Sequence, residues 1–491
     1  MTGDSLSTRK SVADILAADA EGGEDARLPR ALSAFDLVAL GVGATIGAGI
    51  FVLTGTAAAN YAGPGLTLSF VLGGIACGFV ALCYAELAAM VPAPGSTYTY
   101  ATATLGEACA WIIGWDLVLE YAMSAATVAV GWSGYVRSLL GQVGLHLPPA
   151  LTAAPFTALS GGATAWFDLP AAAIIGVLTL LLVRGNRAST RVNAVMVAIK
   201  VAIIVSFVCI GAVHVDPRLW SPLVPENTGA FGDFGWSGVL RGAGVVFFAF
   251  IGFETISTAA GETRNPQRDA PIGLLGSLGV STVLYVAVAA VLTGLVPYRA
   301  LDVPDPIARA VEVIGLGAFS VAIKIGAILG LTTAALAALY GQARIFYAMA
   351  RDGLLPPAFA RLHPRFRTPA ISQVTIGAVT ALVAGLVPID LLGELVSIGT
   401  LFAFMVICTA VLVLRRIDPA RPRPFRVPGM PVVPVLGILS CLSLMLGLPG
   451  DTWLRLALWL AVGLAIYFGY GRRAARLRRM GAPGLDEAPA R

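Results

Sequence analysis

The chain has 491 residues, of which 57% are hydrophobic and only 12% are charged, and its net charge is +5. Soluble globular proteins carry about 25% charged residues, so this composition excludes an ordinary soluble domain. The cations cluster in short loops between apolar segments, which is the usual topology signal of membrane proteins and not a nucleic-acid-binding face. The sequence therefore predicts a polytopic membrane protein that binds no nucleic acid.

Apolar runs separated by Pro, Gly and Arg clusters predict twelve membrane-spanning helices, each near the roughly 20 residues that a bilayer requires. Residues 1–34 are polar and lack the apolar core of a signal peptide, so they predict a cytosolic tail. A transporter-like membrane domain is expected over 35–471 and a second cytosolic tail over 472–491. The expected spans are 35–59, 65–91, 98–138, 168–184, 191–214, 236–261, 270–296, 314–346, 370–388, 390–414, 431–449 and 452–471.

The distribution of arginine predicts the orientation. With the N-terminus inside, most loop arginines and the basic run RRAARLRR at 472–479 lie on the inner side. The positive-inside rule then places both termini in the cytosol of a cell whose cytoplasmic (inner) membrane holds the protein. The six cysteines all lie in apolar segments without a CxxC motif, so we expect neither disulfides nor a metal site.

Two of the expected helices are interrupted by glycine. GATIGAGIF lies in the first span and FFAFIGFETIS in the sixth. The two segments are five spans apart, so they would cross the membrane in opposite senses. Paired interrupted helices in matching halves indicate an inverted-repeat transporter with a site near the bilayer midplane. We expect a first repeat over about 35–214, a second over about 236–414, and two additional helices over about 431–471.

A helix break inside a membrane exposes backbone groups that need partners. The N–H end of a half-helix carries partial positive charge and suits a carboxylate, whereas the carbonyl end suits an ammonium group or a cation. A site with both ends and few charged side chains fits an α-amino acid. The alternative is that the glycines serve close helix packing, because Gly43 and Gly47 have the GxxxG spacing.

The segment FFAFIGFETISTAAGETRNPQRDAPIG (247–273) resembles the cationic amino acid transporter family of the amino acid–polyamine–organocation superfamily. TIGAGIFVLTG, CYAELAAMVPAPGSTYTY, GWDLVLEYA and LYGQARIFYAMARDGLLP support this resemblance. It implies an all-α, leucine-transporter-like fold with helices 1 and 6 broken, and secondary active transport of amino acids. It also implies that the main chain around the first break holds the carboxylate, that carbonyls of the second hold the ammonium group, and that Phe253 forms an outer lid. The implied substrate-binding residues are Thr45, Ile46, Gly47, Ala48, Gly49, Ile50, Phe248, Ala249, Phe250, Ile251, Phe253 and Ala338. Ala338 matches a position that sets pocket size in this family.

Ionisable residues inside a bilayer are costly and mark functional candidates. Lys200 lies about 13 Å into its segment at 1.5 Å per residue, where it either loses a proton during coupling or statically neutralises broken-helix carbonyls. The resemblance places it where sodium-coupled relatives bind their ion. Glu120 is a candidate for proton coupling or for contact with a cationic side chain, with a purely hydrogen-bonded carboxyl as the alternative. Glu254 is expected to hold its half-helix in place. The residues Glu86, Glu262, Arg264, Arg268 and Arg344 could form a cytosolic gate or a solvated interface.

An enzyme is the less favoured class, since the three histidines lie far apart in loops and no GxSxG, HExxH or P-loop motif is present. A channel is the other rival, and it would not accumulate solute against a gradient. We therefore expect a proton-coupled symporter of cationic or neutral α-amino acids, with exchange or sodium coupling as alternatives. Its expected partners are the amino acid, the proton and the lipid bilayer, with a monomer as the default state and no cofactor.

Overall fold

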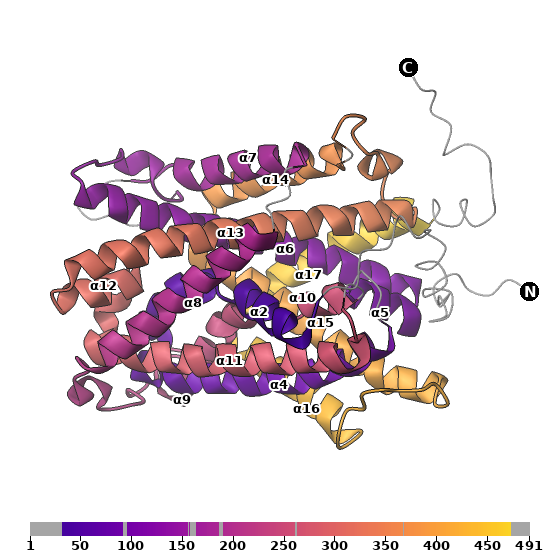
Figure 1. The fold of residues 1–491 in the computed structure, drawn as a ribbon, viewed down its shortest axis with the longest axis horizontal. Coiled ribbons are helices and arrows are strands. Elements are labelled where there is room, and N and C mark those ends of the chain that lie inside the picture. Colours follow the sequence, from indigo (N-terminus) through magenta and orange to yellow (C-terminus); the bar gives the residue numbers. More distant parts are fainter. Residues whose placement is uncertain are drawn as a thin grey trace, which may run out of the picture.

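The computed structural model describes residues 32–91, 96–155, 157, 164–185, 190–260, 263–366 and 368–472. It is built of helices, and the sequential order of the long ones follows the apolar segments of the chain (Figure 1). The α-helices are α2 (Ala34–Thr45), α3 (Thr54–Ala57), α4 (Leu66–Met90), α5 (Ser96–Thr104), α6 (Glu107–Gln142), α7 (Leu169–Val183), α8 (Thr190–Ala212), α9 (Gly235–Val246), α10 (Thr255–Ala259), α11 (Pro266–Leu295), α12 (Pro306–Val313), α13 (Gly317–Arg351), α14 (Ala370–Leu386), α15 (Ile389–Ile417), α16 (Val432–Gly447) and α17 (Gly450–Ile466).

Shorter helical turns connect these elements. The π-helical turns are η3 (Gly49–Leu53), η4 (Ala58–Ala62) and η12 (Tyr467–Gly471). The 3₁₀ turns are η5 (Gly63–Gly65), η6 (Pro149–Leu151), η7 (Pro217–Trp220), η8 (Phe247–Phe250), η10 (Tyr298–Leu301) and η11 (Pro357–Ala360). The backbone hydrogen-bonding pattern thus alternates between π and α in the resumed part of the first broken helix, where η3, α3 and η4 follow one another.

Eight helical stretches in the described part of the chain are long and apolar enough to cross a membrane. Of four shorter apolar helices, α7, α14 and α16 coincide with further expected spans, and α2 is the first half of the first expected span. The longest stretch, Gly49–Met90, covers the second half of the first expected span and nearly all of the second, and Gly63 with φ +58° marks their junction. The protein is therefore an all-helical, multi-pass membrane protein, and the number of spans and the five-plus-five repeat remain predictions.

The expected third span, 98–138, is in fact two helices. Gly106 separates α5 from α6 and has φ +94°, a conformation that non-glycine residues rarely adopt. The turn at Leu105-Gly106 contains no proline, and the one charge beside it is Glu107, the first residue of α6. This is why hydropathy alone merged the two helices.

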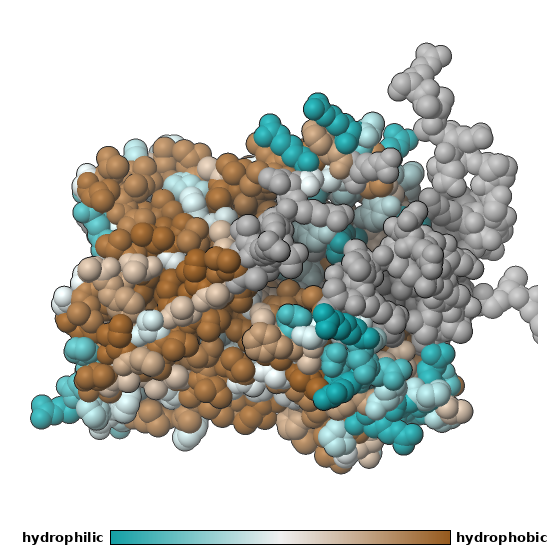
Figure 2. All heavy atoms as spheres, in the orientation of Figure 1, coloured by the Kyte–Doolittle hydropathy of each residue, from teal (hydrophilic) through white to brown (hydrophobic). Residues whose placement is uncertain are grey.

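The long helices pack against one another along the long axis of the molecule. α6 packs against α13 and α15, and α11 packs against α4 and α2. α12 lies at one end of the long axis and α5 at the other, and we call these ends the α12 face and the α5 face (Figure 1). In the view of Figure 2, apolar residues cover most of the middle, and hydrophilic residues gather toward the two ends. By the arginine distribution, the α5 face is predicted to be cytosolic.

Candidate functional site

The first broken helix is interrupted at Ile46 and Gly47. α2 starts with a capping box between Ser33 and Asp36 and ends at Thr45. Ile46 then adopts extended dihedrals, φ −73° and ψ 98°, before the helix resumes at η3. The Thr45 hydroxyl donates back to the carbonyl of Gly41 at 3.1 Å and lies 2.8 Å from the Ser281 hydroxyl on α11. These bonds fix the end of α2 where its last carbonyls lose their helical partners.

The second broken helix is interrupted after η8. Ile251 is extended, with ψ 133°, and Gly252 has φ +119°. The N–H of Gly252 donates to Glu254 Oε2 at 2.8 Å. Because the carboxylate of Glu254 caps a main-chain donor within the break, it stabilises the local backbone conformation. The structural role expected for Glu254 from the sequence remains a prediction.

The two breaks touch each other. A Cβ placed on Gly49 would overlap the Cα of Ala249, and a Cβ on Gly252 would lie 2.8 Å from the carbonyl oxygen of Ala44. Neither contact tolerates a side chain without movement of backbone. The glycines at these two positions therefore let the interrupted segments approach at van der Waals distance.

Main-chain groups at both breaks lack helical partners. Within the described residues, the N–H of Gly47 has no backbone acceptor and the carbonyl of Ile251 has no backbone donor. Ala48 and Gly49 stand at the start of the resumed helix, where N–H groups have no intrahelical acceptor. The breaks thus present donors on one side and an acceptor on the other.

A cavity of about 150 Å³ lies at these breaks. Of the residues expected to bind substrate, Thr45, Gly47, Ala48, Phe248, Ile251 and Ala338 line it, together with the candidates Glu120, Lys200 and Glu254. The remaining lining residues are Leu40, Gly43, Ala44, Tyr121, Ser124, Val128, Val197, Gly252, Thr255, Thr333, Ala334 and Ala337. The lining comes from α2, α6, α8 and α13 as well as from the breaks, so residues far apart in sequence meet here.

The other expected substrate residues lie behind the lining. Ile46, Gly49, Ile50, Ala249 and Phe250 are buried. Phe250 packs edge-on against Tyr285, with ring centroids 5.4 Å apart.

Phe253, the expected lid, is also fully buried. Its ring centroid is 5.5 Å from that of Phe404 and 6.1 Å from that of Tyr84. It therefore belongs to an aromatic cluster behind the cavity wall, and a lid role for it remains a prediction.

Lys200 lies at the end of the first half-helix. Its side chain is buried, the residue being 1% exposed, and its Nζ donates to the carbonyl oxygens of Gly43 and Ile46, both at 3.2 Å. These are the carbonyls left without helical donors by the break. The lysine therefore occupies the position of a cation at the negative end of α2. Both interpretations of Lys200, coupling group or static cation, are compatible with this contact.

Two carboxyl groups border the same cavity. Glu120 is 3% exposed and its Oε2 has no hydrogen-bond partner within the described residues. Glu254 is 8% exposed and bonds to the main chain of its own break. One turn before Glu120 on α6, Asp116 is fully buried with both oxygens unpartnered in the described part. Unpartnered buried acids are rare and point to solvent, ion or substrate contacts in another state.

Among the gate candidates that the structure describes, Glu86, Arg344 and Arg264 each make different contacts. Glu86 accepts from Arg415 Nε at 3.0 Å and from the N–H of Val427 at 2.7 Å, and Arg423 Nε lies 3.4 Å away. Arg344 stacks over the ring of Tyr340 at 4.3 Å, and the N–H of Arg264 donates to Leu32 at 2.9 Å.

The last two gate candidates are Arg268 and Glu262. Arg268 is exposed, and Glu262 lies outside the described residues. The sequence carries no local signal for the partner of Glu86, because Arg415 lies 329 residues away.

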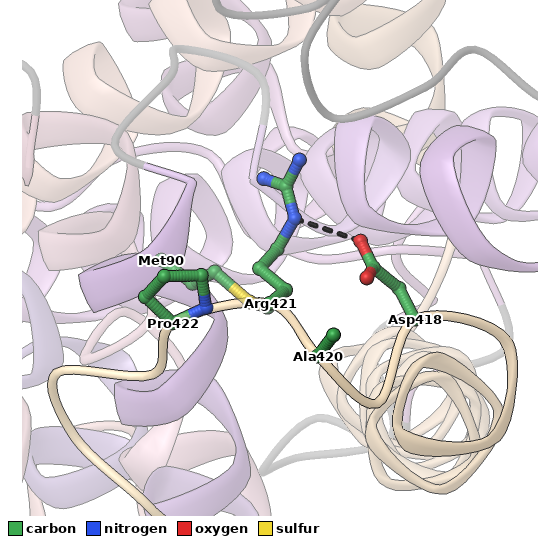
Figure 3. A pocket seen from close by; sticks show the side chains of 5 residues that line it. All are labelled: Met90, Asp418, Ala420, Arg421 and Pro422. Carbon is green, nitrogen blue, oxygen red and sulfur yellow. Dashed lines mark hydrogen bonds and ion pairs between the residues drawn. The ribbon is translucent and has the colours of Figure 1, made fainter.

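A second hollow of about 500 Å³ lies on the loop after α15 (Figure 3). It is lined by Met90, Asp418, Ala420, Arg421 and Pro422, which belong to the end of α4 and to the loop. Arg421 Nε donates to Asp418 Oδ2 at 2.9 Å. None of the residues at the two breaks lines this hollow, so it is separate from the cavity described above.

Two interrupted helices that enclose a small cavity, apolar over most of its wall but bordered by Lys200, Glu120 and Glu254, define a membrane transporter when they lie inside an apolar helical bundle. The comparison with known families agrees with this class. The chain belongs to the amino acid permease family, whose model matches residues 32–465. This confirms the resemblance to amino acid–polyamine–organocation permeases found in the sequence.

Individual relatives cover almost the whole chain. The methylthioribose transporter of Bacillus subtilis (strain 168) is 48% identical over 452 residues, which are 92% of this chain and 95% of that protein. The branched-chain amino acid permease BcaP of the same organism is 48% identical over 476 residues, covering 97% and 99%. The vacuolar cationic amino acid transporter 4 of Arabidopsis thaliana is 39% identical over 393 residues, covering 80% and 64%. The relatives are transporters by name, but their names differ in solute.

Proposed function

We propose that the protein carries α-amino acids across the cell membrane by alternating access and that it couples their movement to protons. The observation that carries this proposal is the pairing of two features at one cavity. Free main-chain groups at the breaks can hold the amino acid, and Lys200 lies on the carbonyls of the adjacent half-helix. The proposed amino acid site and the titratable Lys200 therefore lie at the same broken helix.

The α-carboxylate of the substrate would accept from the N–H groups of Gly47, Ala48 and Gly49. The α-ammonium group would donate to the carbonyl of Ile251 and its neighbours at the second break. Both ends of the zwitterion are then held by main-chain dipoles, so no arginine or aspartate is needed at the midplane. The protein thus avoids the free-energy cost of burying a charged side chain in the bilayer for each end of the substrate.

Proton coupling would act through the end of α2. Protonated Lys200 donates to the carbonyls of Gly43 and Ile46. Loss of its proton removes a positive charge and leaves fewer donors for these carbonyls, which weakens the hold on α2 where the cavity wall forms. Movement of this half-helix would then open or close the cavity toward the α5 face. Glu120 is the second proposed proton acceptor, because its free Oε2 lies at the same cavity.

The side-chain end of the cavity fits cationic or neutral amino acids. Ala334, Ala337 and Ala338 leave space along α13, and Val128 adds an apolar wall. Glu120 and Glu254 add acceptors for a basic side chain. The names of the relatives include both branched-chain and cationic amino acids, and one names methylthioribose. A substrate panel therefore has to contain all three kinds.

The decisive experiment is uptake into proteoliposomes with an imposed pH gradient. The panel contains labelled leucine, isoleucine, arginine, lysine and alanine, with unlabelled methylthioribose as competitor. We expect the wild type to accumulate at least one amino acid above equilibrium when the outside is acid. Uptake that requires a sodium gradient, or that proceeds only with internal amino acid, would replace proton symport with sodium symport or exchange.

Lys200→Met separates the two roles of the lysine, because methionine keeps the apolar stem and removes the charge. If Lys200 couples transport to protons, the variant loses accumulation driven by the pH gradient but keeps counterflow exchange. A lysine that only neutralises carbonyls predicts equal loss of both activities. Glu120→Gln tests the second acceptor in the same two assays, with monodisperse elution in detergent as the control for folding.

A further inference from the structure

The hollow on the loop after α15 lies where three apolar helices have their ends. α4 ends at Met90 and α15 at Ile417, and α16 begins at Val432. α5 follows α4 directly in the chain, so these helix ends lie on the α5 face (Figure 1). Spanning helices end where the hydrocarbon of the bilayer meets the headgroup region. The hollow, lined by Met90 and by residues of the loop, is therefore at the height of lipid headgroups.

Exposed apolar side chains adjoin this loop on both sides in sequence. Ile417, the last residue of α15, is 44% exposed, and Val432, the first residue of α16, is 57% exposed. On the outside of a membrane protein such side chains face lipid tails, which are as apolar as they are. Met90, Ala420 and Pro422 give the hollow itself a partly uncharged wall. The hollow therefore borders a surface that the acyl chains of a lipid can cover.

Buried polar contacts hold the loop in one shape. The guanidinium group of Arg423, whose side chain is 6% exposed, donates to the carbonyl of Asp418 at 2.7 Å and to that of Arg421 at 2.9 Å. The carboxylate of Glu86 on α4 accepts from the N–H of Val427 at 2.7 Å. The main chain of the loop is thus tied to a buried arginine and to the end of α4. The hollow is therefore preorganised, which lowers the entropy cost of binding a ligand there.

Arginine donors at the loop are left over after its internal contacts are made. Arg421 uses its Nε for Asp418, and its two terminal nitrogens have no acceptor within the described residues. Figure 3 shows these two nitrogens directed away from Asp418 and from the main chain of the loop. Arg416 and Arg426 are exposed, and their guanidinium groups form no hydrogen bond or ion pair in the part of the chain that the structure describes. Three cations thus stand against the one carboxylate of Asp418, so the local charge favours an anion.

We propose that this hollow binds the headgroup of an anionic phospholipid. The phosphate oxygens accept from the terminal nitrogens of Arg421, and Arg416 and Arg426 add attraction from the same loop. Met90 and Pro422 contact the apolar part of the lipid next to its headgroup. A soluble phosphate would find the same donors but would gain nothing from the apolar wall. The site is separate from the cavity at the broken helices, and the proposal is independent of the solute that the protein carries.

The test measures lipid binding directly, without the need for transport. The full chain is purified in detergent, stripped of lipid and titrated with phosphatidylglycerol, and native mass spectrometry gives the dissociation constant of the first bound lipid. We expect the wild type to bind phosphatidylglycerol more tightly than phosphatidylcholine with the same acyl chains. Arg421→Gln is expected to weaken the binding of the first phosphatidylglycerol about fivefold, which corresponds to about 1 kcal/mol for one arginine near a lipid surface.

Asp418→Asn is expected to act in the opposite direction. It removes the negative charge from the hollow and frees Arg421 Nε, so the affinity for phosphatidylglycerol should rise. A loop that only lost its shape would lose affinity in both variants. Arg361→Gln is the matched control, because Arg361 is an exposed arginine that follows η11 and does not line the hollow. It removes the same charge as Arg421→Gln and is expected to leave the affinity for the first lipid unchanged.

Equal binding of phosphatidylcholine and phosphatidylglycerol by the wild type overturns the proposal, as does an equal loss of affinity in Arg361→Gln and Arg421→Gln. Displacement of phosphatidylglycerol by an equal concentration of soluble glycerol phosphate also overturns it, because the ligand is then a free phosphate and not a lipid. If Arg421→Gln does not elute as a single species in detergent, Asp418→Asn carries the test. Unchanged or weaker binding in that variant then counts against the site.

Discussion

Gly49 and Ala249 bring the two broken helices into direct backbone contact, because a Cβ placed at Gly49 would overlap the Cα of Ala249. Gly47, two residues earlier, has a different environment. A Cβ there would meet only the Cβ of Ala334, at 3.6 Å, which is ordinary van der Waals distance. Two glycines of one motif thus have separate structural tasks, one in packing and one at the cavity.

We expect Gly49→Ala to destabilise the protein by about 1–3 kcal/mol, the usual cost of overpacking. Gly47→Ala is expected to keep the stability of the wild type and to weaken amino acid binding, because its methyl group enters the cavity beside the free N–H groups. Thermal unfolding in detergent and substrate binding are measured for both variants. Equal losses of thermal stability in the two variants would contradict this division.

Ala338→Leu is expected to narrow the cavity along α13, where Ala338 is 8% exposed. Uptake of amino acids with long side chains should fall sharply, while uptake of alanine, if it is a substrate, should persist. The measurement is the ratio of initial rates for the two kinds of substrate, which cancels differences in expression. A uniform loss for all substrates would show that Ala338 serves packing only.

Glu86→Gln should destabilise the protein by about 3–5 kcal/mol, because it leaves buried arginine charge without its carboxylate. The side chain of Glu86 is only 2% exposed and it faces Arg415 and Arg423. Asp418→Asn is the matched control, since the pair of Asp418 with Arg421 is more exposed and should contribute about 0–1 kcal/mol (Figure 3). Thermal unfolding is measured for both variants. Similar shifts of the melting temperature in the two would contradict the expected difference.

Phe253→Leu tests the lid expected from the family resemblance. As a member of the aromatic cluster with Tyr84 and Phe404, Phe253 should affect stability and leave the apparent substrate affinity unchanged. Phe248→Leu, at the cavity wall, should lower that affinity. Competition binding with a transported amino acid compares the two. Loss of affinity in Phe253→Leu without loss of stability would restore the lid.

The interruptions in the first and sixth spans could be predicted because glycine and irregular backbone are tolerated in a bilayer only at protein-lined cavities. The all-helical class followed from long apolar runs alone. The division of the third span at Gly106 could not be predicted, because an apolar run has the same hydropathy whether or not it turns. The short helix α12 was likewise absent from the expected elements, since its eight residues lie in a connection that carries charge.

The contacts of buried charges were harder to predict than their positions. The depth of Lys200 in its segment indicated burial, but its acceptors Gly43 and Ile46 lie more than 150 residues away in sequence. Glu86 and Arg415 are separated by 329 residues. Partners at such separations depend on how the helices assemble, and no local pattern contains that information. The electrostatic roles of single residues therefore need the tertiary structure.

The free N–H groups at Gly47 and the resumed helix have an evolutionary consequence. They belong to the peptide backbone, so no substitution that keeps the backbone course, proline apart, can delete them. The cavity side chains, such as Ala338 and Glu120, are open to replacement without loss of that anchor. If these N–H groups bind the substrate carboxylate as proposed, a chain of this architecture can change the solute it prefers through few mutations, and each intermediate keeps the carboxylate site.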